Sequence, residues 1–171
     1  MQMVKKSAGI VFAIWLSLLV FMPKAEIYYM LEKKLLTQDI TLNERSIEEG
    51  IFSLSVNNVT VYVKGIALAS IEELDFFTLL FYNTLDIKEL EIDEALHSKV
   101  PAKIQEAHVV QHILAPTTLA LDANGSFGII TGKINILDKQ VHIDFVKTKE
   151  IGMIQPYLQK NEKGWFYEKT F

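Results

Sequence analysis

The segment LDANGSFGIITGKINILDKQVHIDF, residues 121–145, carries the clearest strand pattern in the 171-residue chain. Apolar and polar residues alternate up to Asn124–Gly125, a dipeptide typical of tight hairpin turns. The alternation then resumes, and a second turn is expected at Asp138–Lys139. Gly128 and Gly132 interrupt the pattern, which indicates a bulge or the close approach of another backbone. The segment therefore predicts an antiparallel meander with one apolar face.

The same period of two occurs upstream, from residue 39 onward. In GIFSLSV, residues 50–56, alternate apolar side chains share one face and serines share the other. Asn57–Asn58 is expected to form a turn, because asparagine tolerates positive φ. A strand over 59–63 follows, and Lys64–Gly65 indicates another turn. These elements predict a first meander with an apolar face of its own.

The middle of the chain is harder to assign because residues 70–83 are densely apolar. We interpret Ile71–Phe76 as a strand and Thr78–Tyr82 as a hydrophobic crossover, since periodicity alone cannot decide here. A change of phase in the following strand predicts a bulge near Lys88–Glu89. Residues 97–116 are expected to form a strand and then a loop.

The C-terminal part is expected to add a short helix and a last strand to the sheet. A short helix broken by Pro156 is predicted over 150–159. The final GWFYEKTF is expected to be a strand that pairs with the sheet, with an exposed docking strand as the alternative. The predicted fold is mostly β, a curved antiparallel β-meander sheet over residues 39–171.

The N-terminal segment predicts a membrane anchor. Residues 7–23 contain no charge and approach the length needed to cross a bilayer. A cleaved signal peptide is the alternative, but small residues are missing before a cleavage site. Residues 1–6 would be a cytoplasmic leader and residues 39–171 a periplasmic domain. Residues 24–38 are expected to form a juxtamembrane helix that begins at Pro23.

Composition and motifs argue against several classes of function. The chain has no cysteine, a net charge of −4 and no basic run that would suit nucleic acid. His108 and His112 have helical metal-ligand spacing, but on a strand they would lie about 13 Å apart. A cluster of carboxylates is interpreted as a solvated strand edge: Asp86, Glu89, Glu91, Asp93 and Glu94. No phosphate-binding or nucleophile motif occurs. We therefore expect no enzyme activity, no cofactor and no metal site.

The order of elements supports a resemblance to known envelope proteins. A basic leader, an apolar span ending in Met22–Pro23–Lys24 and a helix precede GIFSLSVNNVTVYVKGIALASIEELDF and LDANGSFGIITGKINILDKQVHIDF. This arrangement resembles the type II secretion system protein N family and, more loosely, AsmA-type envelope proteins. The resemblance implies a single-pass inner-membrane protein of bacteria with a periplasmic β domain that serves a secretion or envelope-assembly machine.

Two functions follow as expectations. The first is a non-enzymatic subunit of a secretion or pilus-type machine that binds other envelope proteins. The alternative is a lipid-binding or lipid-transfer protein whose sheet leaves an apolar groove open. The candidate partner or lipid contacts are the aromatic and aliphatic residues Phe76, Phe77, Leu80, Phe81, Trp165, Phe166 and Tyr167.

Overall fold

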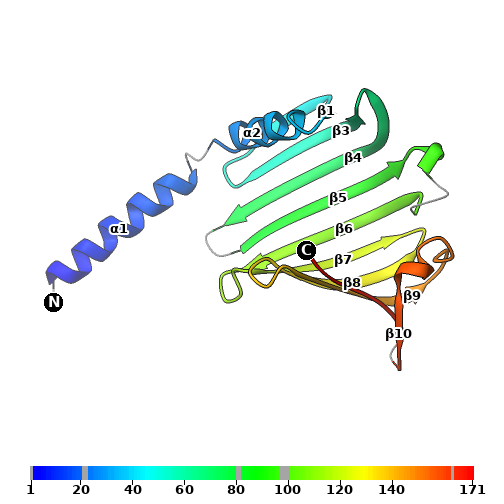
Figure 1. The fold of residues 1–171 in the computed structure, drawn as a ribbon. Coiled ribbons are helices and arrows are strands. Elements are labelled where there is room, and N and C mark those ends of the chain that lie inside the picture. Colours follow the sequence, from blue (N-terminus) through cyan, green and yellow to red (C-terminus); the bar gives the residue numbers. More distant parts are fainter. Residues whose placement is uncertain (1, 21–22, 80–81, 97–100, 163) are drawn as a thin grey trace.

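A computed structural model describes residues 2–20, 23–79, 82–96, 101–162 and 164–171 of the chain. Two helices come first, α1 (Gln2–Val20) and α2 (Lys24–Leu36). Helix α1 extends away from the rest of the molecule, whereas α2 lies along one side of a large sheet (Figure 1). The helix expected over 24–38 is confirmed by α2 within two residues of its predicted end.

All the strands belong to one antiparallel sheet that is not closed, as expected. The strands in chain order are β1 (Ile40–Asn43), β2 (Ser46–Glu49), β3 (Ser53–Val63), β4 (Ile66–Leu79), β5 (Tyr82–Ile92), β6 (Lys103–His112), β7 (Thr118–Gly125), β8 (Gly128–Asn135), β9 (Gln140–Thr148), β10 (Gln159–Asn161) and β11 (Gly164–Thr170). Their spatial order is β1-β3-β4-β5-β6-β7-β8-β9-β11-β10, with β2 also paired to β3. Nearly every neighbour in space is therefore a neighbour in sequence, as a meander requires.

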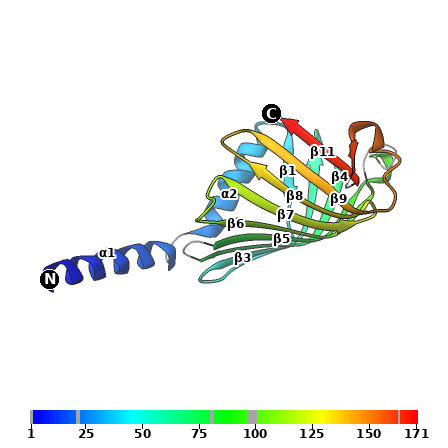
Figure 2. The ribbon, with the colours of Figure 1, turned by 90° about the horizontal axis from the view of Figure 1, so that it is seen from below.

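The sheet bends into a trough (Figure 2). Helix α2 lies inside the bend near β1 and β3, and β11 forms part of the opposite wall. The C-terminal strand thus pairs with β9 and is covered by β10, so the expectation that it joins the sheet is confirmed. The short helix expected over 150–159 is a single 3-10 turn at Gln155–Tyr157, with Pro156 within it.

The first of two small apolar cores lies beneath α2. Tyr28 on α2 packs on four apolar residues of β3 and β4, among which Val56 is completely buried and Val59 almost so. The backbone N–H of Lys24 also donates a hydrogen bond of 2.8 Å to a carboxylate oxygen of Glu49, which fixes the start of α2. Helix α2 therefore covers the β3–β4 part of the concave face.

The second core lies at the other side of the trough, near the ends of β7 and β9. It consists of Phe127 with Ala107 and Ala123, and Phe145 meets the Phe127 ring edge-on at 6.5 Å. Ile151 and Ile154 pack on this cluster from the segment that precedes β10. Ile87 on β5 packs against both clusters, so the two cores meet at the middle of the sheet.

Several expectations are corrected. The crossover expected over Thr78–Tyr82 is wrong at both ends, since β4 continues to Leu79 and β5 begins at Tyr82. Asn57 and Asn58 lie within β3, where Asn58 has φ 52° and introduces a change of phase that lets Val56 and Val59 face the same core. The hairpin expected at Asn124–Gly125 turns two residues later, at Ser126–Phe127. Asn124 instead donates a 3.1 Å hydrogen bond from its side chain to Gln105 on β6.

The carboxylates expected on a solvated edge lie mainly on β5, which is an interior strand. Cross-strand cations balance them: Lys103 on β6 pairs with Glu89, and with Glu91 at 2.8 Å. The change of phase expected near Lys88–Glu89 occurs at Glu89, which has φ 49°. The pairing register of β5 with β4 and β6 is unbroken there, so the expected bulge is wrong. The ion pairs place these carboxylates on the polar face of the sheet and not at its margin.

Within the described residues, no helix combines the length and the apolar character that a membrane crossing requires. The span expected over 7–23 includes residues 21–22, which lie outside the described residues. The apolar side chains of α1 from Ile10 to Leu16 are largely exposed.

The burial of Tyr28 on α2 predicts that the folded protein loses stability at alkaline pH. Burial, together with Glu44, raises the pKa of Tyr28 above its ordinary value of 10.0. The folded state therefore holds this proton more tightly, so its stabilisation is complete below pH 10 and is lost as the pH rises toward the folded pKa. Above pH 10, we expect the free energy of unfolding to fall less steeply with pH in Tyr28→Phe than in the unsubstituted protein. The two slopes should differ by up to about 1.4 kcal/mol per pH unit. Urea midpoints at pH 8 and pH 11 measure this, with the exposed Tyr29→Phe as control. Equal slopes in the two variants would contradict it.

Candidate functional site

The concave face carries two continuous rows of apolar side chains that cross eight strands. Each row follows the residue pairing between neighbouring strands, so its members lie side by side. The first row is Leu54, Phe76, Leu85, Val109, Leu121, Gly132, Ile143 and Tyr167. The second is Val56, Leu74, Ile87, Ala107, Ala123, Ile130, Phe145 and Trp165. Because period two puts alternate residues on opposite faces, both rows line the inside of the trough.

The convex face is polar at the same level. The row between the two apolar rows reads Ser55, Asp75, Asp86, His108, Asp122, Thr131, Asp144 and Phe166. Water solvates the polar convex face readily. The concave face exposes apolar surface to water wherever no other element or ligand covers it. The chemical contrast between the two faces makes the trough the candidate functional site.

Different parts of the trough are covered by other elements to different extents. The first core lies beneath α2, and the second lies beneath Ile151 and Ile154. The part of the apolar face toward the β6–β7 and β8–β9 turns is half-buried, and it comprises Leu85, Val109, Leu119, Ile134 and Val141. We call these five residues the open strip. A large apolar strip left open in a folded domain marks a site for a ligand or a partner.

A cavity of about 260 Å³ adjoins the covered end of the trough. Its lining is apolar and aromatic, and comprises Pro101, Phe127, Ile130, Ile143, Phe145, Ile154, Tyr157, Leu158 and Tyr167. Ile143 and Tyr167 also belong to the first apolar row, so the cavity continues the trough beneath the 151–158 segment. The cavity offers van der Waals contact and apolar burial and has no charged lining residue.

The opposite end of the trough carries a short ladder of neutral polar side chains. The hydroxyl of Thr78 donates to the amide oxygen of Asn83 at 2.5 Å, and the Asn83 side chain donates to Gln111 at 2.9 Å. Gln111 in turn donates to the backbone oxygen of Pro116 at 2.6 Å. We call Thr78, Asn83 and Gln111 the mouth ladder. These residues lie on the concave face, in register with Leu119. An amphipathic molecule in the trough would find these polar groups beside the open strip, in the same row as Lys169, which is paired with Val141.

The sequence-predicted contact residues divide between the two faces. Phe76, Trp165 and Tyr167 lie on the concave face, in the apolar rows. Phe77 and Phe166 lie on the convex face, where Phe166 packs 5.6 Å from the His142 ring. Leu80 and Phe81 lie outside the described residues. Phe76 belongs to the α2 core and Tyr167 to the cavity, so the structure brings them to one trough and not to one patch.

The three described histidines lie apart from one another, on β6 and β9. His108 lies on β6 with its Nδ1 against the carboxylate of Asp86, and His112 packs 5.1 Å from the Tyr82 ring at the end of the strand. His142 lies 3.3 Å from Asp144. In the part of the chain that the structure describes, no three potential ligands converge.

Sequence reasoning missed the open strip and the mouth ladder. Alternation predicted which residues share a face within a strand, but not which strands of the two meanders would be neighbours. Pairing between β5 and β6 joins the two meanders and makes their apolar faces continuous. Comparison of the chain with protein-family models, curated protein sequences and solved structures gives no match. The geometry of the trough therefore carries the functional argument alone.

Proposed function

We propose that the chain binds lipid acyl chains along the concave face of its sheet. The observation that carries this proposal is the pair of apolar rows across eight strands, interrupted by a residue without a side chain at Gly132, opposite a polar convex row. Acyl chains suit such a surface because each methylene moved from water to an apolar environment contributes about 0.8 kcal/mol. Binding along a row needs no directional contact, which fits two rows that contain no charged residue.

Helix α1 is the second part of the proposal. Its exposed apolar side chains hold the chain at a membrane, as the single-pass anchor expected from the sequence would. In a bacterium the sheet would then lie on the periplasmic side of the inner membrane, as the resemblance to envelope proteins implies. A role as a protein-binding subunit of a secretion machine is the alternative.

Lipid retention tests the proposal directly. The full chain is purified in a maltoside detergent and its lipids are extracted and quantified by mass spectrometry. We expect about one diacyl lipid per chain, displaced by excess NBD-labelled phosphatidylethanolamine with a rise in probe fluorescence. No retained lipid and no probe binding, together with a near-stoichiometric envelope protein crosslinked in native membranes, would replace the lipid proposal by the subunit role.

A further inference from the structure

Large exposed apolar side chains gather at one end of the trough. Three turns and the C-terminus contribute them, and they are Ile51, Ile113, Leu114, Ile136, Leu137 and Phe171. We call these six residues the apolar rim. All are at least half exposed, and Leu114 is 96% exposed. Such side chains are rarely gathered on protruding turns of a water-facing surface.

Strand pairing places the rim residues at a common end. The 50–52 turn adjoins the end of β4 through a hydrogen bond from Thr78 N–H to the Phe52 carbonyl. The 113–117 and 136–139 turns are linked by the pair Thr118–Asn135. The Phe171 N–H donates to the Lys139 carbonyl at 2.9 Å. Figures 1 and 2 agree that α1 leaves the sheet at this same end.

The opposite end of the trough has a different surface. Its turns present Lys64, Glu94, Lys149 and Glu150 to solvent, and Ile151 and Ile154 cover the apolar face there. By contrast, the rim turns 50–52 and 113–117 contain no charged residue, and 136–139 contains one of each sign. The open end of the trough therefore exposes mainly apolar turns with no net charge. The covered end exposes charged turns, with Ile66 and Tyr157 as exposed apolar residues among them.

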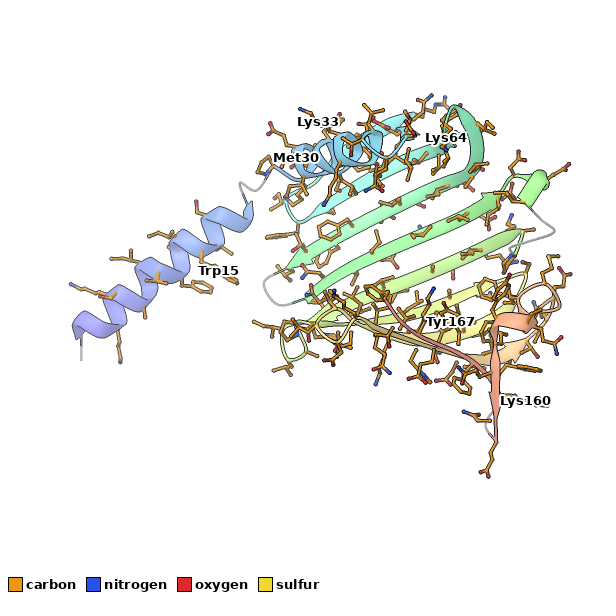
Figure 3. The ribbon with its side chains drawn as sticks, viewed as in Figure 1. Trp15, Met30, Lys33, Lys64, Lys160 and Tyr167 are labelled. Atoms are coloured by element: carbon orange, nitrogen blue, oxygen red, sulfur yellow. The ribbon has the colours of Figure 1, made fainter. Side chains whose placement is uncertain are left out.

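We infer that the apolar rim inserts into the lipid bilayer and thereby opens the trough toward the membrane. Three observations select a bilayer as the occupant. The rim is continuous with the open strip, through Ile134 and Ile136 on either side of Asn135. Its net charge is zero, so apolar insertion and not electrostatic attraction would hold it. Exposed α1 leads away from the same end, which Figure 3 shows with Trp15 far from the sheet.

The mouth ladder acquires a role in this arrangement. With the rim in the interface, Thr78, Asn83 and Gln111 lie near the headgroup level, and Tyr82 lies beside them. Tyrosine favours the membrane interface, where its ring is apolar and its hydroxyl is wet. A lipid could pass its acyl chains from the bilayer onto the open strip while its headgroup stays among polar groups. This inference rests on the proposed function, because an open end matters only if the trough carries lipid.

The absence of cysteine from the chain gives a clean test. Leu114→Cys in the rim and Ile66→Cys at the opposite end are each labelled with NBD in the full chain. Both positions are strongly exposed, at 96% and 65%, so neither substitution disturbs the core. The proteins are reconstituted into phosphatidylcholine–phosphatidylglycerol vesicles that contain nitroxide-labelled lipid. We expect at least threefold stronger quenching at position 114 than at position 66, unchanged in high salt because the contact is apolar.

Two outcomes would overturn the inference. Weak quenching at both positions would leave the rim in water. Blue-shifted emission at position 114 without lipid quenching, rising with protein concentration, would show that a second copy of the chain covers the rim. Binding of the acyl probe by unlabelled chain in detergent is measured separately and needs no bilayer. The two measurements therefore distinguish an error about insertion of the rim into the bilayer from an error about acyl-chain binding in the trough.

Discussion

A glutamate in place of Val109 is expected to weaken binding of an acyl probe by about a hundredfold or more. Val109 lies in the first apolar row between Leu85 and Leu121, and it belongs to the open strip. A carboxylate there would be covered by the bound acyl chain, and an unpaired buried charge costs several kcal/mol. Since each 1.4 kcal/mol is a factor of ten in affinity, a hundredfold loss corresponds to about 2.8 kcal/mol.

The adjacent residue supplies a matched control. Val110 has the same side chain on the same strand, but it faces the convex side between Thr84 and Ala120. Both valines are half-buried in the free chain. Val110→Glu is expected to change probe affinity by less than about twofold, because its carboxylate meets water and not lipid.

Probe titrations in detergent measure both variants, with circular dichroism melting curves to establish that each is folded. Val109→Leu extends the test, because it keeps the face apolar and is expected to retain binding. If the Val109 and Val110 glutamates weaken binding equally, or if neither does, acyl chains do not lie on the concave face. That result would hold whether or not α1 and the apolar rim associate with a membrane.

Much of the fold follows from local pattern. Period two and turn chemistry predicted both meanders, and Lys64–Gly65 forms the expected turn with positive φ at both residues. The errors have physical causes in tertiary contacts. Asn124–Gly125 has the composition of a turn, but Gly125 is needed in the strand because a Cβ there would lie 2.5 Å from the Lys103 carbonyl oxygen. Hairpin preference was thus overridden by the close approach of β6.

The candidate site was less accessible to sequence reasoning. Aromatic residues drew attention to Phe77 and Phe166, but each follows a concave residue directly in its strand, so period two puts it on the convex face. The open strip consists of ordinary aliphatic residues that would pass as core in any sheet protein. Their significance depends on the limited reach of α2 and of residues 151–158, which is a property of tertiary structure. No local pattern encodes the absence of a second layer.

Alanine in place of Gly128 is expected to destabilise the fold by about 3 to 5 kcal/mol. Gly128 has φ +106°, a conformation that side-chain-bearing residues rarely adopt, which costs about 1–2 kcal/mol. A Cβ there would also lie 1.8 Å from the Lys147 carbonyl oxygen on β9. Relief of that overlap requires β8 and β9 to separate, and a loss of packing of this kind belongs with the largest single-residue effects.

Two other glycines separate the cost of backbone strain from the cost of steric overlap. Gly65 has φ +79° but open space around its missing Cβ, so Gly65→Ala is expected to cost about 1–2 kcal/mol from backbone strain alone. Gly152 has open space and no positive φ, so Gly152→Ala is expected to be neutral or to stabilise by up to about 1 kcal/mol. Urea unfolding of the full chain in detergent, followed by circular dichroism, gives the three values on one scale.

The position of Gly128 connects this stability test to the trough. The glycine ends the Ser126–Phe127 turn, and that turn directs Phe127 into the second core beneath Ile154. The backbone N–H of Lys149 also donates to the Phe127 carbonyl at 2.9 Å, so the turn holds the segment that covers this end. If Gly128→Ala proved no more costly than Gly65→Ala, the Lys147 backbone would yield freely and the covered end would be loosely built. The expected larger cost instead implies that the backbones of β8 and β9 are held closely together at this end, where Ile151 and Ile154 cover the second core.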